Sequence, residues 1–294
     1  MARAKPKYKY VIYEKGGNIA KITLNRPDKL NAFPFFGGIT ADFHAALNEA
    51  EEDDDVKVVI IKAAGRAFSA GHDLEEVGFV YGMGTGKSGE RRASQRIRLK
   101  IDRTGFCENH RRLFLFPKVT IAQVHGFCIG EGLIVATCCD ITIAAEDAQI
   151  GHTEQRLGFA GSGIGTIPLL MLAVGWKRAR ELLLTGKQIS GKEAAEIGLV
   201  NKAVPGNQLD DEVQKMAEAI ALLPRDGIAI GKAMTHAVYD SLGLTSGFTH
   251  GYIGHTLFTN LRWEEDEYNF FKQRREKGAK AGFHGRDERY TGKL

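Results

Sequence analysis

The stretch HGFCIGEGLIVATCCD (residues 125–140) places three glycines and one carboxylate in front of an apolar run. It follows VTIAQV (119–124), which is typical of a buried strand because its side chains are mainly apolar and β-branched. We therefore expect the chain to turn at the glycines and to begin a helix near Glu131. Gly130 and Gly132 would allow the sharp turn and a close approach of the backbone to a ligand.

The segments before and after this stretch predict a repeated strand–strand–helix pattern. Residues 9–27 read as a hairpin whose two β-rich runs flank a glycine turn. Residues 40–54 are typical of a helix that is capped by Thr40. Two near-continuous apolar runs, 56–65 and 140–147, predict buried strands. This order indicates an α/β fold built from repeated ββα units.

The second half of the chain is predicted to be mainly helical. A strand is expected at 198–205, and helices are expected at 164–175, 177–186, 190–198, 209–223, 226–242 and 262–278. We place a boundary near residue 205, between an α/β body (1–205) and a helical region (206–294). The last segment, 277–294, is basic and glycine-rich, and we expect a frayed terminus or an arm that grips an anion.

Composition indicates a globular protein. Of its 294 residues 43% are hydrophobic and 26% charged, and the net charge of +4 favours an anionic ligand without marking a nucleic-acid surface. No run approaches the roughly 18 apolar residues of a membrane span, and the start MARAKPKYKY lacks the apolar core of a secretory leader. The four cysteines form no C-x-x-C pair, so we expect Cys138 and Cys139 to be buried thiols in a reducing compartment.

Motif searches exclude other common chemistries. YGMGTGKSG (81–89) has Tyr81 where a phosphate loop needs glycine, so we expect a flexible loop, with a lid over the substrate as one role. Ser162 lacks the flanks of a hydrolase nucleophile elbow. The nine histidines form no metal-binding spacing, so no metal site is predicted. His250 and His255 are expected to pack between helices.

Three segments together carry a family resemblance: LNRPDKLNAF (24–33), AFSAGHDL (67–74) and the stretch from residue 124 to residue 159. From about residue 8 to about residue 240, the chain resembles the crotonase (enoyl-CoA hydratase/isomerase) superfamily. The resemblance implies a crotonase-type spiral of ββα units with a helical C-terminal trimerisation region. It also implies an acyl-CoA thioester substrate, with coenzyme A as part of the substrate and no permanently bound cofactor.

The resemblance also implies an oxyanion hole. The superfamily stabilises a thioester enolate with two backbone N–H groups, which here match the amides of His72 and Glu131. Such donors favour the charged oxygen over the neutral carbonyl, each by about 3 kcal/mol in a dry site. Ala70, Gly71 and Gly130 belong to the same two motifs and are the predicted lining of the bound thioester.

Several charged side chains are candidates for the edge of this site. The family commonly has a small residue at the position of Glu131, so its side chain is expected to face solvent or an interface, as first-turn glutamates do. The alternative is an extra carboxylate at the pocket edge. Arg66 matches a basic position near the nucleotide of coenzyme A, and Lys277 and Lys280 are candidates to reach a neighbouring subunit's ligand.

Glu154, in GHTEQRLG, matches the second acid of the hydratases and is the predicted general acid/base. The first acid would fall at position 134, where this chain has Ile134, which cannot hold or activate water. Because a pocket lined by Ile134 disfavours a carboxylate, we expect the pKa of Glu154 to be raised. A surface carboxylate paired with Arg156 is the alternative for Glu154, and His72 and His152 are secondary acid/base candidates.

These inferences favour an acyl-CoA enzyme that acts as a hydratase, isomerase or lyase, with hydro-lyase chemistry first. Because the first acid is missing, a hydrolase that cleaves a carbon–carbon bond of a cyclic β-dicarbonyl or a β-keto thioester stays open. A third hypothesis is a non-catalytic RNA-binding protein, although no nucleic-acid or membrane partner is expected. We expect a cytoplasmic homotrimer or dimer of trimers (a hexamer) that acts in fatty acid metabolism.

Overall fold

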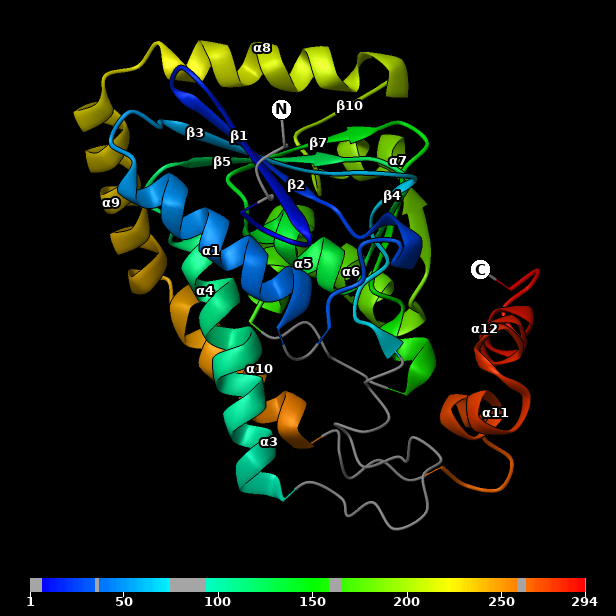
Figure 1. Ribbon diagram of the computed structural model, residues 1–294. Helices are drawn as coiled ribbons and strands as arrows, with labels where there is room; N and C mark the ends of the chain where they lie inside the picture. Colours follow the sequence, from blue (N-terminus) through cyan, green and yellow to red (C-terminus); the bar gives the residue numbers. More distant parts are fainter. Residues whose placement is uncertain (1–6, 35–36, 75–93, 159–164, 258–262, 294) are drawn as a thin grey trace.

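Two β-sheets form the centre of the molecule in the computed structural model, which describes residues 7–34, 37–74, 94–158, 165–257 and 263–293 (Figure 1). The strands are β1 (Val11–Gly16), β2 (Ile19–Leu24), β3 (Val58–Ala63), β4 (Ala67–Ser69), β5 (Val119–Val124), β6 (Phe127–Ile129), β7 (Ile141–Ala145), β8 (Gln149–Gly151), β9 (Gln188–Ser190) and β10 (Lys202–Val204). The larger sheet has the order β1-β2-β3-β5-β7-β10, and its neighbours are parallel except for β1 and β2. The smaller has the order β4-β6-β8-β9, and its neighbours are parallel except for β8 and β9.

The central strands are buried because their sequences are apolar on both faces. β3 is buried along nearly its whole length, and its Ile61 is paired in register with Ile22 of β2. Apolar runs of this kind suit parallel strands that are covered on both faces. The predicted hairpin and the three predicted buried strands are therefore confirmed.

Helices cover both faces of the larger sheet. α8 packs on one face, whereas α1 and α5 lie on the other (Figure 1). The α-helices are α1 (Gly38–Glu52), α3 (Gln95–Ile101), α4 (Glu108–Phe114), α5 (Glu131–Cys138), α6 (Ile167–Thr185), α7 (Gly191–Glu196), α8 (Leu209–Ala221), α9 (Arg225–Ser241), α10 (Leu244–Leu257), α11 (Phe270–Lys277) and α12 (Ala279–Glu288). Shorter turns are the 3-10 helices η1 (Pro27–Lys29), η3 (Thr153–Leu157) and η4 (Gly206–Gln208), and the π-helix η2 (Asp102–Cys107).

One helix prediction in the body needs correction, and another is confirmed. Thr40 does not cap α1, which begins two residues earlier after a glycine, and its hydroxyl donates instead to Pro34 O at 3.2 Å. The break predicted between the helices 164–175 and 177–186 is confirmed, because α6, which spans both, has a kink at Gly175. Gly175 has φ +74°, a conformation that glycine adopts readily and that interrupts the helix.

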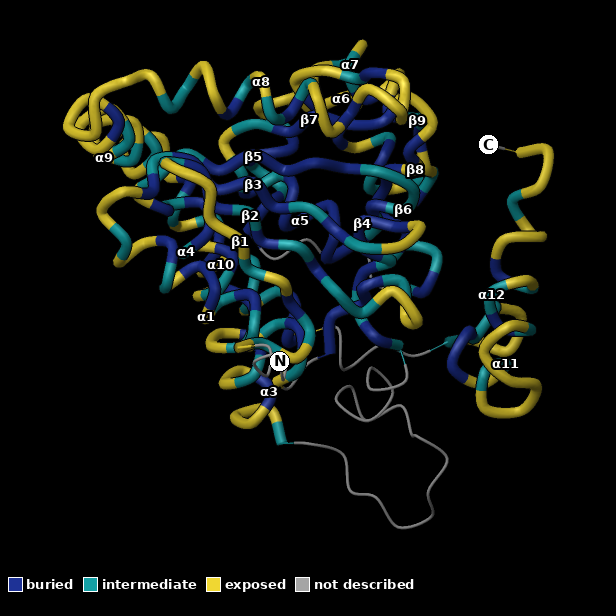
Figure 2. Tube along the Cα trace, turned by 45° about the horizontal axis from the view of Figure 1, so that its top comes forward, coloured by how far each residue is buried: buried dark blue, intermediate teal, exposed yellow. Residues whose placement is uncertain are grey.

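The C-terminal region differs from the prediction at its end. The helix predicted at 262–278 begins only with α11, because the Asn269 side chain accepts from Lys272 N and caps it there. Within the segment 277–294, residues Ala279–Glu288 form α12 rather than a frayed terminus, and an arm that grips an anion stays a prediction. Figure 2 shows α11 and α12 to the side of the sheets, as does Figure 1. The division at residue 205 stays a prediction, and α8, just after it, packs on the larger sheet.

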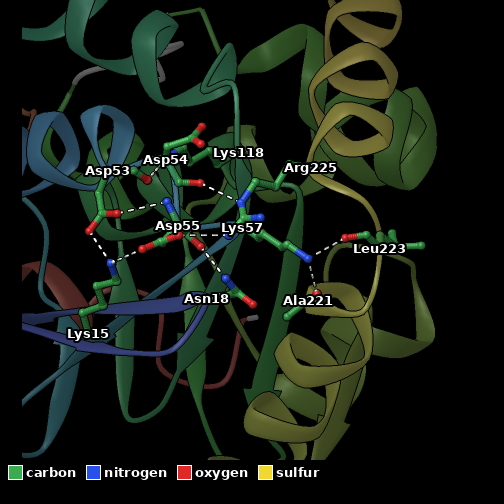
Figure 3. Close-up of polar contacts among 10 residues, drawn as sticks. All are labelled: Lys15, Asn18, Asp53, Asp54, Asp55, Lys57, Lys118, Ala221, Leu223 and Arg225. Atoms are coloured by element: carbon green, nitrogen blue, oxygen red, sulfur yellow. Dashed lines mark hydrogen bonds and ion pairs between the residues drawn. The ribbon is translucent and has the colours of Figure 1, made fainter.

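A polar cluster ties the N-terminal hairpin to the ends of α1 and α8 (Figure 3). Lys118 Nζ donates to the carbonyls of Ala50 and Asp53 at the end of α1. Lys57 Nζ donates to two carbonyls at the end of α8, both at 2.8 Å, and Lys15 in the hairpin pairs with the Asp53 carboxylate. Because the last carbonyls of a helix have no partner within it, the lysines satisfy acceptors that would otherwise depend on water.

The four cysteines are free thiols. Cys107, Cys128 and Cys138 are buried and Cys139 is half-buried, so the expected burial of the adjacent pair is confirmed in full for Cys138 and in part for Cys139. In the ranges that the structure describes, no helix combines the length and apolar character needed to cross a membrane.

Candidate active site

The segment that carries His72 follows β4 and is held on one side by Phe33. Phe33 N donates to Gly71 O at 2.8 Å, and Asp73 N donates to Phe33 O at 2.9 Å. Because successive peptide N–H groups of an extended chain point in opposite directions, the His72 N–H points away from Phe33. An ion pair of 2.9 Å between Arg26 and Asp73 fixes the end of this segment.

The start of α5 lies beside the same segment. Gly130 turns the chain at φ +54°, and the helix begins at Glu131, as predicted. A Cβ built on Gly71 would lie 3.0 Å from Ile129 O and 3.6 Å from Glu131 N. The Glu131 N–H occupies the first position of the helix, where no carbonyl of the same helix can accept it. The two chain segments that were predicted to supply the amides are therefore neighbours in space.

Glu154 lies in η3, shortly after β8, and its carboxylate contacts the same turn. Its side chain is 18% exposed, and Oε1 lies so close to Gly130 that a Cβ built there would overlap with it. Its Oε2 lies 3.4 Å from His152 Nδ1. Arg156, the alternative partner of Glu154, lies 3.7 Å from Asp287 instead. The structure therefore brings Glu154 to the glycine turn.

The predicted raised pKa of Glu154 is wrong in direction. Burial is the largest single influence and raises the pKa of this carboxyl, but the hydrogen bond and charge of His152, together with a backbone hydrogen bond and the charge of His72, bring the pKa below its ordinary value. The contact between His152 and Glu154 was not predicted from the sequence. Ile134 belongs to the hydrophobic core and is 4% exposed. At neutral pH the Glu154 carboxylate is ionised and able to accept a proton.

The expectation that the Glu131 side chain faces solvent is also wrong. This side chain is 7% exposed and lies between two histidines. His110 Nε2 is 2.6 Å from Glu131 Oε1, and His72 Nε2 is 3.4 Å from Glu131 Oε2. Since an ionised carboxylate only accepts hydrogen bonds, His110 is the donor. The alternative expectation, an additional carboxylate at this edge of the site, describes its position better.

These histidines determine the charge of Glu131. Burial alone would raise the pKa of its carboxyl, but His110 and His72 hold that pKa below the ordinary value. Burial lowers the pKa of the His72 imidazole, so His72 is neutral at neutral pH. Among the groups that lower the pKa of Glu131, His110 has the largest effect, first through its charge and then through its hydrogen bond.

The remaining predicted site residues lie at the edge of this arrangement or away from it. Arg66 is exposed in the turn between β3 and β4. Ala70 is half-buried, and its N–H donates to Leu30 O at 3.0 Å. Lys277 and Lys280 are exposed at the junction of α11 and α12. Contacts of these residues with coenzyme A stay predictions.

The sequence analysis missed His110. It lies on α4, 21 residues before Glu131, and no motif or helical spacing connects the two positions. The neighbouring π-helix η2 supplies Phe106, whose ring packs against His72 with centroids 4.8 Å apart. Only the packing of these helices on the start of α5 reveals the contact.

Other predicted positions have mixed outcomes. His255 is buried and lies 3.2 Å from Asp102 through Nδ1, which confirms that it packs between helices, whereas His250 is exposed and that expectation was wrong. The loop 81–89 and Ser162 lie outside the described residues. In the described part of the chain, no group of three His, Cys, Asp or Glu side chains could hold a metal ion.

Comparisons with known proteins identify the family. The sequence profile of the enoyl-CoA hydratase/isomerase family matches residues 14–266 of this chain. The chain belongs to the enoyl-CoA hydratase/isomerase family. A candidate enoyl-CoA hydratase of Mycobacterium tuberculosis, EchA13, is 33% identical over 275 residues, which cover 90% of this chain and 85% of that protein.

Solved structures of this family share the fold. The crystal structure of an enoyl-CoA hydratase/isomerase from Xanthobacter autotrophicus Py2 is similar with a TM-score of 0.81 and 31% identity, covering 96% of this chain and 99% of that chain. An enoyl-CoA hydratase from Mycobacterium smegmatis gives a TM-score of 0.79 and 27% identity, covering 96% and 94%. The predicted crotonase fold is therefore confirmed, and the family acts on acyl-CoA thioesters.

Proposed function

We propose that this chain is an acyl-CoA enzyme of the hydratase/isomerase type, which stabilises a thioester enolate with the amides of His72 and Glu131. The observation that carries the proposal is that three elements meet at one turn. Gly71 lies beside Glu131 N, and Glu154 Oε1 lies against Gly130. A thioester carbonyl held by the two amides would therefore lie beside an ionised carboxylate.

Enolate formation is the step that this arrangement would accelerate. Removal of a proton next to the thioester carbonyl moves negative charge onto the carbonyl oxygen. The two amides then bind the enolate more strongly than the ground state, by about 3 kcal/mol for each donor. The positive end of the α5 dipole adds to this effect, because the helix begins at Glu131.

Glu154 is the proposed proton carrier. Its ionised carboxylate accepts the proton and, once protonated, returns it to another carbon in isomerisation or to a leaving hydroxyl in dehydration. In the hydration direction the same carboxylate would activate water, with His152 at 3.4 Å holding it in place. Since Ile134 is part of the core, a single carboxylate would serve both steps.

We place hydro-lyase chemistry first and keep one alternative. The pairing of Glu154 with His152 would also suit activation of water for hydrolysis of a carbon–carbon bond in a cyclic β-dicarbonyl or a β-keto thioester. Mass spectrometry separates these reactions. Hydration adds one water to an intact acyl-CoA, whereas hydrolysis releases a new carboxylate.

The proposal includes self-association of the chain as a trimer or a dimer of trimers. Side chains spaced four residues apart form an apolar stripe on α9, with exposed fractions from 54% to 68%: Ile230, Met234, Val238 and Leu242. Exposed apolar patches of this kind mark contact surfaces. The free thiols favour a reducing compartment, so we place the enzyme in the cytoplasm, with a role in fatty acid metabolism.

A panel of acyl-CoA thioesters tests the proposal. The purified chain is incubated with 2-enoyl-, 3-enoyl-, 3-hydroxyacyl- and 3-ketoacyl-CoA of several chain lengths, and the products are identified by mass spectrometry. Conversion of at least one enoyl- or hydroxyacyl-CoA, with the thioester intact, is expected. The absence of turnover on the whole panel would contradict the proposed function.

A further inference from the structure

Each proposed amide donor directly follows a glycine in the left-handed region. Gly71 has φ +91° and Gly130 has φ +54°. Because glycine has few steric restrictions, these residues do not by themselves fix the orientation of the peptide N–H that follows. Other contacts must therefore hold the amides of His72 and Glu131 in position.

Part of that constraint comes from the backbone. The bridge to Phe33 holds the peptide groups on either side of His72. On the other segment, Gly130 N donates to Gly151 O at 3.0 Å, and the helix that begins at Glu131 fixes the residues that follow. These bonds secure each segment separately, and the backbone pairing that joins the two, between β4 and β6, ends at Ser69 and Cys128, three residues before His72 and Glu131.

The side chains of the same two residues make a close polar contact between the segments, in which Glu131 Oε2 has no hydrogen bond within the described residues. His72 Nε2 lies 3.4 Å from Glu131 Oε2, and both side chains are largely buried, with 16% and 7% exposed. The other carboxylate oxygen, Glu131 Oε1, lies 2.6 Å from Nε2 of His110, a residue of the separate helix α4. The Glu131 carboxylate thus lies between the segment after β4 and a helix outside the turn.

This arrangement is specific because little water can replace it. A buried carboxylate needs hydrogen-bond donors, and loss of a donor leaves it poorly solvated. The ring of Phe106 packs on His72 and limits its movement away from Glu131. The geometry therefore favours one arrangement of the three side chains.

We infer that Glu131 and His110 are positioning residues: through the Glu131 carboxylate they hold the two amide donors at the spacing that the enolate oxygen requires. This inference rests on the proposed function. The role does not require the carboxylate to touch the substrate or to transfer a proton. A neutral side chain of the same shape that accepts a hydrogen bond from His110 should therefore support nearly the same kcat.

Alanine and the isosteric amide separate positioning from proton transfer. Glu131→Ala removes the connection and should lower kcat on the best acyl-CoA about 10- to 100-fold, because small displacements of catalytic groups have effects of this size. KM should stay within about threefold, since contacts to the rest of coenzyme A are unchanged. Glu131→Gln keeps an acceptor for His110 and should stay within about threefold of the unchanged chain in kcat.

Substitutions of His110 test the other half of the connection. His110→Gln keeps an N–H donor and should stay near the activity of the unchanged chain, whereas His110→Ala should lower kcat as Glu131→Ala does. The double variant Glu131→Ala/His110→Ala should lose no more than the larger single loss, because both changes break one connection. Glu108→Gln, an exposed change on the same helix, is the matched control. Thermal denaturation of every variant shows whether it is folded.

Three outcomes would overturn the inference. If Glu131→Gln lost as much kcat as Glu131→Ala, the charge itself would act in the reaction. If folded Glu131→Ala kept full kcat while Glu154→Gln was inactive, the proposed function would stand and the positioning role would fall. If the unchanged chain turned over no acyl-CoA, the proposed function and this inference would fall together.

Discussion

The Glu154 carboxylate lies against the backbone of Gly130, so close that a Cβ at residue 130 would overlap with Oε1. Gly130 also has a positive φ, which side chains other than glycine rarely adopt. The glycine therefore serves two needs: it turns the chain into α5, and it leaves room for the carboxylate. This contact joins the predicted amide donor to the predicted acid/base in one place.

Gly130→Ala should displace Glu154. The added methyl group cannot share its space with Oε1, so the carboxylate must move away from the reacting carbon. We expect kcat on the best acyl-CoA to fall at least about 100-fold, the low end for loss of a general acid/base group. Steady-state kinetics measures this, and circular dichroism confirms the fold.

Gly231→Ala is the matched control for that substitution. Gly231 lies in α9 with no atom within 4 Å of an added Cβ. It should keep its activity and gain about 0.5–1 kcal/mol in the free energy of unfolding, because alanine favours the helix. An active Gly130→Ala enzyme would show that the contact with Glu154 is not needed.

The pH dependence of the reaction should reveal the partner of Glu154. In the unchanged chain His152 holds the pKa of this carboxyl below its ordinary value in spite of burial. His152→Leu removes that partner and leaves the burial, so the pKa should rise. The acid limb of kcat/KM against pH should therefore move to higher pH. A limb that stayed in place or moved to lower pH would mean that another group controls it.

His44 should make the protein less stable in mild acid. Its Nδ1 is buried without a hydrogen-bond partner in the described residues, and burial lowers the pKa of the imidazole from 6.5 to about 4. Between these values the unfolded chain binds a proton that the folded chain does not. The free energy of unfolding is therefore unaffected by His44 above pH 6.5 and decreases as the pH falls toward 4, by about 3 kcal/mol in all.

Urea unfolding of the unchanged chain and of His44→Leu at several pH values measures this contribution. The difference between the two free energies of unfolding should shrink or change sign in favour of the variant as the pH falls below 6.5. A difference that was constant with pH would exclude His44 as the source of the acid sensitivity.

Lys118 should stabilise the end of α1. Its ammonium donates to the carbonyls of Ala50 and Asp53, as Figure 3 shows for the second. Lys118→Met keeps much of the aliphatic chain but leaves these acceptors without a donor, and should lower the free energy of unfolding by about 1–3 kcal/mol. Lys15→Met, which breaks an exposed ion pair of the same cluster, should have a much smaller effect in the same denaturation experiment. If Lys118→Met lowered the free energy of unfolding as little as Lys15→Met, Lys118 would not stabilise the end of α1.

The parts of the structure that follow from local sequence were predicted well. β3 and β5 are apolar on both faces, and a glycine turn before Glu131 starts α5, because strand burial and glycine conformation depend on nearby residues. The break in α6 at Gly175, where the first of the two predicted helices ends, was also predicted, because glycine readily leaves the helical conformation.

Two features of the charged part of the site were predicted wrongly. The burial of Glu131 depends on His110, which tertiary packing brings from a separate helix. The pKa of Glu154 was predicted in the wrong direction because burial was considered without its neighbour His152. The partner of Glu131 is 21 residues away in the sequence, whereas the partner of Glu154 is only two residues away and its effect on the pKa was overlooked.

The central claim is that Glu154 transfers the proton at a thioester held by two backbone amides. The most direct test is kcat of Glu154→Gln on the best substrate of the acyl-CoA panel, because glutamine keeps the shape of the side chain and cannot accept the proton. The account predicts a loss of at least about 100-fold with the fold intact. A folded Glu154→Gln enzyme that lost less than about tenfold would contradict it.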